Sequence, residues 1–153
     1  MVGPMERYVL ADAAMQIGVE ISRAIENKRI FVIDSDEITR AVLQFMLHDE
    51  NETHELASVE DAIAKCEGRK VDLVLLAHAV VKERGAAVLG KIADGIPGVK
   101  VLLVADSAED AKFCRQLGVA GVVVKPLTVE NVRRKVDAAL GRGPAFNPLK
   151  VLG

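Results

Sequence analysis

The chain has 153 residues, 50% of them hydrophobic, which suffices for one domain with a sizeable core. Only 3% of the residues are aromatic, so Val, Ile, Leu and Ala must build that core. The 20 basic and 22 acidic residues give a net charge of -2, which argues against broad electrostatic binding to nucleic acid or to anionic membranes.

Short buried apolar runs alternate along the chain with helical stripes. The expected strands are residues 29–33, 52–57, 71–76, 100–104 and 121–124, and the polar character of the second places it near a sheet edge. The expected helices are residues 36–48, 58–68, 82–93, 107–118 and 128–140. In the first of them, one apolar face is marked by Ile38, Ala41, Val42 and Phe45. Five β–α units in this rhythm predict a doubly wound α/β fold with a parallel sheet and right-handed connections.

Two segments lie outside the repeat, so we divide the chain into residues 1–28, 29–140 and 141–153. The first carries an amphipathic helical stripe, weakened by Gly18, that consists of Leu10, Ala14, Ile17, Ile21 and Ile25. This extra helix would pack on its own domain or form a two-helix seam in a homodimer. The Gly- and Pro-rich tail from residue 141 is expected to be flexible.

Neither the cysteines nor the N-terminus suggests a metal centre, a disulfide or an export signal. Cys66 and Cys114 lie far apart without the spacing of a metal site. The first residues lack the basic-then-apolar layout of a signal peptide, and no apolar run would span a bilayer. The sequence therefore predicts a cytoplasmic protein that needs no cofactor and contacts neither membrane nor nucleic acid.

Ligands of open α/β sheets collect at the carboxyl ends of the strands. The segments FVIDSDEITR, VDLVLLA, VKVLLVADS and GVAGVVVKPL place those ends in the order and spacing of a known family. Over about residues 29–140 the chain resembles the receiver domain of bacterial response regulators. The resemblance implies a flavodoxin-like sheet with strand order 2-1-3-4-5.

The resemblance also implies a phosphorylation pocket, and this chain departs from its pattern at the acidic positions. Receivers carry two adjacent acidic residues after the first strand, where this chain has Asp34 and Ser35. They carry the phosphate-accepting aspartate after the third strand, where this chain has Ala77. Alanine can neither accept a phosphoryl group nor bind a metal, so the nucleophile that the family uses is missing from this chain.

Three further receiver positions lie on the fourth and fifth strands. The hydroxyl residue that contacts the phosphate corresponds to Val104, and the switch aromatic corresponds to Val122. The lysine is retained as Lys125, and its bond to Pro126 is often cis in the family. Of the family's pocket residues, only Asp34 and Lys125 remain.

A charge count indicates what these losses do to a metal site. Three carboxylates and one lysine leave about -2, which a divalent cation with oxygen ligands neutralises. Asp34 and Lys125 alone sum to zero, so we expect them to form an ion pair without a metal. A magnesium site rebuilt from Asp34 and Asp36 is the weaker alternative, because Asp36 is well placed to begin a helix.

The histidines give no clear site by sequence. His78 follows Ala77 and has the chemistry of a substitute phosphate acceptor, but strand alternation turns it away from the Ala77 direction, so we expect an ordinary loop histidine. His48 and His54 have no acidic or cysteine partners at ligand spacing.

The last helix carries a cluster of charges that allows two interpretations. Helical spacing pairs Glu130 with Arg133 and Arg134, and Arg133 with Asp137, as on an ordinary solvated face. The resemblance allows an interaction face instead, because receivers often pair through this region. Its candidate residues are Lys112, Arg115, Val122, Arg133, Arg134 and Asp137.

The sequence favours a non-catalytic, phosphorylation-independent receiver-like module that binds a signalling protein of unknown identity or a second copy of itself. The alternative is a sensor that binds a small anion or metabolite in the pocket between Asp34, Ala77, Val104 and Lys125. A conventional phosphorylatable regulator is a third possibility. Nucleotide binding is weakly supported, because the chain contains neither a GxGxxG nor a GxxxxGK[ST] motif.

Overall fold

The computed structural model describes residues 27–142. The expected N-terminal helix with its stripe of Leu10, Ala14, Ile17, Ile21 and Ile25 lies outside the described residues, as does the tail from residue 143 onward. Within the described range, no helix has both the length and the apolar composition that crossing a membrane requires.

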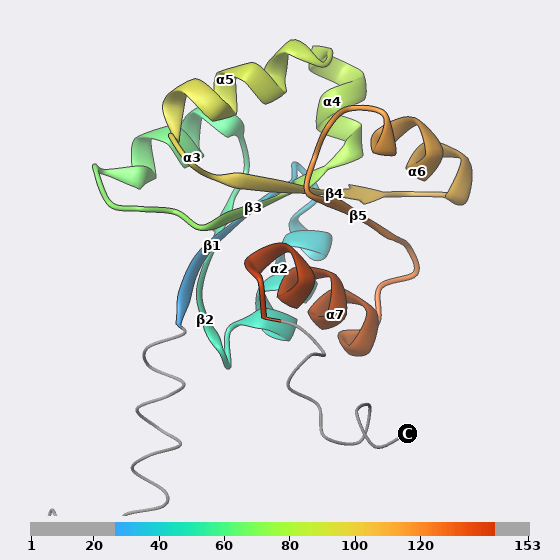
Figure 1. Cartoon of the computed structure of the whole chain (residues 1–153), viewed down its shortest axis with the longest axis horizontal. Coiled ribbons are helices and arrows are strands. Elements are labelled where there is room, and N and C mark those ends of the chain that lie inside the picture. The colour runs from blue at the N-terminus through green and yellow to red at the C-terminus, as the bar shows by residue number, and fades with distance from the viewer. Residues whose placement is uncertain (1–26, 143–153) are drawn as a thin grey trace, which may run out of the picture.

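The core of the fold is a parallel sheet of five strands in the order β2-β1-β3-β4-β5, which confirms the flavodoxin-like topology (Figure 1). The strands are β1 (Lys28–Ile33), β2 (Asn51–Leu56), β3 (Leu73–Ala77), β4 (Lys100–Ala105) and β5 (Gly121–Val124). Every residue of β3 is buried, as its uninterrupted apolar run requires for a strand covered on both faces. The polar β2 lies at one edge, as expected.

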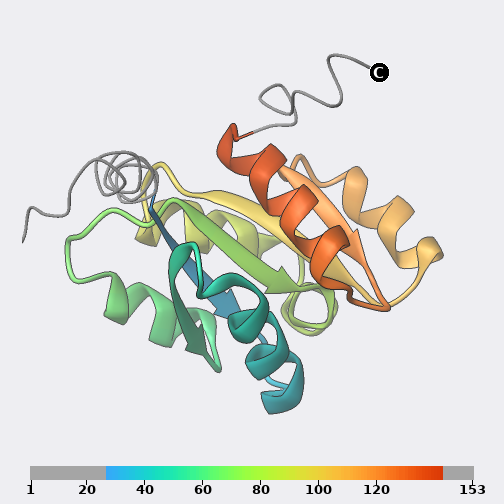
Figure 2. The same cartoon turned by 90° about the horizontal axis from the view of Figure 1, so that it is seen from below.

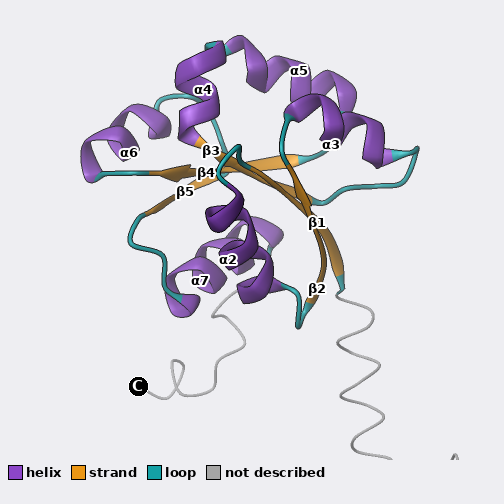
Figure 3. Cartoon of the chain, turned by 180° about the vertical axis from the view of Figure 1, so that it is seen from behind, coloured by secondary structure: helices purple, strands orange, loops and turns teal. Residues whose placement is uncertain are grey.

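Helices cover both faces of the sheet (Figure 3). They are α2 (Glu37–Leu47), α3 (Val59–Cys66), α4 (His78–Arg84), α5 (Ala87–Gly95), α6 (Ala108–Arg115) and α7 (Val129–Leu140). Leu43 of α2 and Val132 of α7 share one core cluster with Ile30 and Val32 of β1. The side chains of α3, α4, α5 and α6 join the other cluster, on the opposite face. Figure 2 shows α2 and α7 together in front of the sheet.

The helix starts follow the capping signals of the sequence. Ser58 accepts a hydrogen bond from the Asp61 backbone N–H at 3.1 Å, and Ser107 accepts one from Asp110 at 3.1 Å. Thr128 caps α7 in the same way. These side chains satisfy N–H groups that have no partner within the helix, which fixes where each helix begins.

The helix expected over residues 82–93 is wrong in both its start and its continuity. α4 begins at His78, directly after β3, and a second helix, α5, follows it. Gly85 separates the two with a φ of 85°. A glycine adopts that conformation without steric cost, so the chain can turn there and lay two short helices over the sheet.

The orientation of α2 also differs from the simplest interpretation of its apolar face. The side chains of Ile38, Val42 and Phe45 are 74%, 37% and 70% exposed. The helix buries another stripe instead, composed of Thr39, Leu43, Met46 and Leu47. Thr39 tolerates burial because its hydroxyl donates to Asp36 Oδ2 at 2.6 Å.

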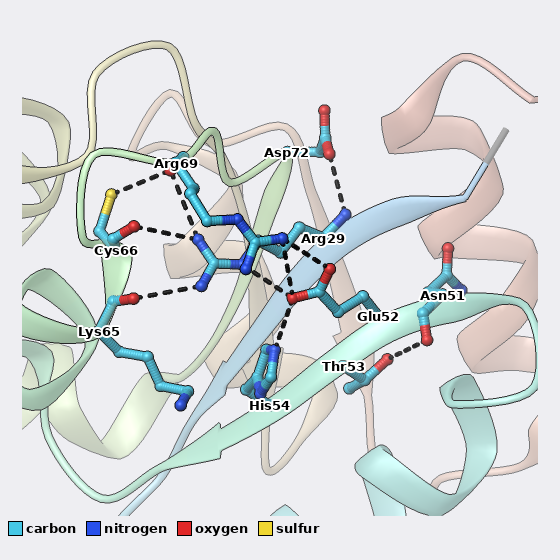
Figure 4. Close-up of polar contacts among 9 residues, drawn as sticks. All are labelled: Arg29, Asn51, Glu52, Thr53, His54, Lys65, Cys66, Arg69 and Asp72. Carbon is cyan, nitrogen blue, oxygen red and sulfur yellow. Dashed lines mark hydrogen bonds and ion pairs between the residues drawn. The ribbon is translucent and has the colours of Figure 1, made fainter. Parts of the chain in front are cut away.

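A buried arginine joins β1, β2 and the end of α3 (Figure 4). Arg29 Nε donates to Glu52 Oε2 at 3.1 Å, and its Nη1 and Nη2 donate to the carbonyls of Cys66 and Lys65 at 3.1 and 3.2 Å. Glu52 also accepts from Arg69 Nη2 at 3.1 Å. Arg29 therefore satisfies carbonyls at the C-terminus of α3 while its charge is balanced by Glu52.

Candidate functional site

The sequence-predicted pocket residues meet at the carboxyl edge of the sheet. Leu76 pairs in register with Ile33, so Asp34 and Ala77 follow on neighbouring strands. Ala77 in turn pairs with Val104 of β4, and Ala105 pairs with the last residue of β5. The topology therefore brings Asp34, Ala77, Val104 and Lys125 to one end of the fold, as expected.

Asp34 is the buried carboxylate of this edge, with 5% of its surface exposed. Burial raises the pKa of Asp34, while the N–H of Asp36, which donates to Asp34 Oδ1 at 2.9 Å, and the charge of Lys125 both lower it. The net direction is upward, so the surroundings favour the protonated form of Asp34 more than water does. Ser35, the next residue, is exposed.

The expected ion pair between Asp34 and Lys125 is wrong. Lys125 Nζ lies 3.0 Å from Asp106 Oδ1, in the loop after β4, and the structure records no ion pair of Lys125 with Asp34. Both partners are partly exposed, at 33% and 52%. Lys125 therefore pairs with Asp106 at the rim, where both charges keep much of their hydration and the desolvation cost of pairing is lower than beside the buried Asp34. The peptide bond between Lys125 and Pro126 is cis.

The remaining positions of the pocket are apolar. Ala77 is 6% exposed and belongs to the core cluster under α3, α4, α5 and α6. Val104 is 3% exposed and belongs to the cluster under α2 and α7. Ala77 and Val104 therefore offer only methyl groups, on opposite faces of the sheet at its carboxyl edge.

The geometry also disfavours a magnesium site rebuilt from Asp34 and Asp36. Asp36 caps α2: its carboxylate accepts from the Ile38 N–H at 3.2 Å and from the Thr39 hydroxyl at 2.6 Å. These bonds lower the pKa of Asp36 and engage both of its oxygens. Among residues 27–142, no three His, Cys, Asp or Glu side chains are grouped so that they could hold a metal ion.

Comparison with known proteins identifies the family. The sequence model of the family described as the response regulator receiver domain matches residues 30–137 of this chain. The chain belongs to this family. As a receiver domain it is a signalling module rather than a classical enzyme. No curated protein matches it.

Solved structures with low sequence identity share the receiver fold. A response regulator from Thermotoga maritima is 18% identical, with a TM-score of 0.65 over 75% of this chain and 98% of its own. NtrX from Brucella abortus, solved with ADP, is 22% identical with a TM-score of 0.65, over 82% of this chain and 29% of its own. A Burkholderia pseudomallei response regulator, solved with a phosphorylated aspartic acid, calcium and citrate, is 18% identical with a TM-score of 0.59, over 81% and 75%.

His78 of this receiver is not the loop histidine that the sequence suggested. It is the first residue of α4 and is 2% exposed. Its Nδ1 lies 3.8 Å from Asp110 Oδ2 of α6, its ring centroid lies 5.7 Å from that of Phe113, and neither ring nitrogen has a hydrogen-bond partner within residues 27–142. The side chain therefore packs between α4 and α6.

The other two histidines do have acidic neighbours, contrary to the sequence-based view. His54 Nε2 lies 2.8 Å from Glu52 Oε2, and His48 Nε2 lies 3.3 Å from Asp49 Oδ1. For His54 the signal was present, because residues two apart on a strand point to the same face.

The candidate interaction face is only partly available on the surface of the receiver. Val122 is 3% exposed in the core, so its side chain cannot contact a partner. Arg133 does not pair with Asp137: its Nε donates to the Met46 carbonyl at 3.2 Å, and its Nη2 lies 3.5 Å from Asp49. Asp137 instead lies 3.5 Å from Arg142 Nη1.

Lys112 and Arg115 of α6 and Arg134 of α7 remain exposed. Arg134 Nη2 donates to Asn131 Oδ1 on its own helix at 2.8 Å. These three cations are the exposed members of the predicted face, whereas the side chains of Arg133 and Asp137 are 34% and 38% exposed and already paired.

Proposed function

We propose that this receiver signals by protein–protein contact without phosphorylation of an aspartate. The observation that carries the proposal is Ala77, which stands at the carboxyl end of β3, where the family places its acceptor. A methyl group offers no lone pair to phosphorus, so transfer to this position has no chemical route.

The residues around Ala77 support the same interpretation. A receiver switches because the phosphorylated form is bound better by one conformation, and a ligand shifts populations only through such a difference. Val104 offers no hydroxyl to a phosphoryl oxygen, and Val122 is a buried aliphatic residue where receivers have their switch aromatic. Without these contacts the domain has one preferred state until a partner binds.

The electrostatics of the pocket also support independence from metal and phosphate. The Nζ of Lys125 is paired with Asp106, and Asp36 is engaged as a helix cap. Asp34 is then the carboxylate left for a divalent ion, whereas tight magnesium sites use several oxygen ligands together. The proposed output is a partner protein in the cytoplasm, contacted in part through Lys112, Arg115 and Arg134.

The decisive experiment is intact-mass measurement after treatment of the full chain with acetyl phosphate and magnesium. We expect no phospho-adduct, while a receiver that retains its aspartate, treated in parallel, becomes labelled. An Ala77→Asp variant of this chain serves as the matched control for the lost acceptor. A stoichiometric adduct on the unsubstituted chain would contradict the proposal, and peptide mapping would then show whether His78 carries it.

The sensor alternative has weaker support. An anion in the pocket would need a free cation, and Lys125 is already neutralised by Asp106. A melting-temperature screen against small anionic metabolites tests this alternative. A saturable rise that disappears in Lys125→Met would favour it over the proposed function.

A further inference from the structure

The exposed face of α2 is an apolar stripe without a partner in residues 27–142. Ile38 and Phe45 are 74% and 70% exposed, and Val42 and the exposed Ala41 lie between them. Their spacing places them on one side of the helix over two turns. The other exposed large apolar side chains of the described residues, Phe113 and Val129, occur singly. A contiguous apolar stripe of this kind marks a contact surface.

The N-terminal segment joins the fold next to this helix. Lys28, the first residue of β1, pairs in register with Asn51, which puts the two backbones about 4.8 Å apart. Asn51 Nδ2 in turn donates to the carbonyl of Leu47, the last residue of α2, at 3.2 Å. Figure 1 shows the start of β1 at the same end of the sheet as the start of β2. Residues before Lys28 therefore begin beside the C-terminal end of α2.

We propose that residues 6–25 form a helix that packs along the exposed stripe of α2 in the same chain. The last part of the N-terminal stripe, from Ile17 to Ile25, matches the exposed stripe of α2 in length, while Leu10 and Ala14 extend beyond it. At 1.5 Å per residue, Ile17 to Ile25 spans about 12 Å, and Ile38 to Phe45 spans about 10.5 Å. Starting from the attachment at Lys28, Ile25 lies against Phe45, Ile21 against Val42, and Ile17 against Ile38.

The connection allows this arrangement. Glu26 and Asn27 remain between the stripe and β1, and two residues are enough to join a helix to a strand.

The tether favours this occupant over a second copy of the chain. A segment held beside its target by a short linker acts at an effective concentration in the millimolar range. A second copy would have to overcome the translational and rotational cost of association. The apolar faces of both elements are then removed from water within one molecule.

Disulfide trapping in the full chain tests the contact. We expect Ile25→Cys/Phe45→Cys to form an intramolecular disulfide under mild oxidation, seen as a faster-migrating monomer on a non-reducing gel. Cys66 and Cys114 are 9% and 0% exposed and can stay in place. Ile25→Cys/Phe113→Cys is the matched control, because Phe113 is half exposed but belongs to α6, on the opposite face of the sheet.

A covalent dimer from Ile25→Cys/Phe45→Cys would overturn the proposal in favour of a second copy, and trapping no greater than in the control would also overturn it. Limited trypsin digestion gives an independent measurement. Cleavage at Arg23 should be about tenfold faster in Ile38→Asp/Phe45→Asp than in the unsubstituted chain, because packing against α2 no longer shields the segment from the protease. Equal cleavage rates, with circular dichroism unchanged, would overturn it as well.

Discussion

Replacing Arg29 by methionine tests whether the buried guanidinium holds α3 to the first strand. The side chain is 6% exposed and donates to Glu52 and to the carbonyls of Lys65 and Cys66. Methionine keeps much of the aliphatic volume but offers no donor, so the change isolates the polar contacts from the packing.

The magnitude follows from what each partner loses. The carbonyl of Cys66 is in a buried bond, and a buried group left without its partner costs about 1–3 kcal/mol. The bond to Lys65 is only partly buried, and Glu52 is one-third exposed, so each adds at most about 1 kcal/mol. We expect Arg29→Met to lower the free energy of unfolding by about 2–4 kcal/mol.

Urea unfolding followed by circular dichroism measures this loss. With a slope of about 2 kcal/mol per molar urea, the midpoint should fall by about 1–2 M at an unchanged slope. Arg69→Met is the matched control, because Arg69 contacts the same Glu52 from a side chain that is 61% exposed. It should change stability by less than about 0.5 kcal/mol. Equal losses in the two variants would refute the role assigned to Arg29.

Four further predictions concern pH and packing. Burial raises the pKa of Asp34, so its ionisation at neutral pH opposes folding. Asp34→Asn should therefore raise the urea midpoint at pH 7. The gain should vanish below pH 3.8, the ordinary pKa of an aspartate, because the carboxyl is then protonated in the folded and the unfolded chain. The pKa of Glu60 is lowered to about 2 by hydrogen bonds from Arg84 and Lys91, so Glu60→Gln should lower the midpoint at pH 7, with the difference disappearing as the pH falls from 4.5 towards 2. A midpoint difference independent of pH would contradict either assignment. In α5, Gly90→Ala should stabilise by up to about 1 kcal/mol because nothing lies near its added Cβ. Gly95→Ala should destabilise by about 1–3 kcal/mol because its Cβ would lie 2.6 Å from Ile63; a gain there would show that Ile63 moves aside.

The sheet and its pocket could be predicted because their signals are local. Each strand is an apolar run, and the carboxyl ends of parallel strands meet wherever the order of the sheet places them. Capping residues such as Ser58 and Ser107 fixed helix starts for the same reason. The start of α4 carried no such signal, because Ala77 precedes it without a capping side chain.

The sequence could not predict the environment of a side chain where two environments were available to it. α2 carries two stripes at helical spacing, and the buried one can include Thr39 because Asp36 accepts a hydrogen bond from its hydroxyl. Lys125 could reach either Asp34 or Asp106, and only the three-dimensional arrangement shows that the exposed partner is chosen. Such choices depend on contacts between distant segments rather than on spacing along the chain.

The two ends of the described chain meet at one residue. Asn51 pairs in register with Lys28 and accepts a hydrogen bond from Arg142 Nη2 at 2.8 Å. A short peptide from residue 142 to residue 27 would therefore close the domain into a ring without disturbing a strand. Reopening that ring at the exposed Gly85, between α4 and α5, would give a circular permutant with the same sheet and with new termini on the face opposite α2.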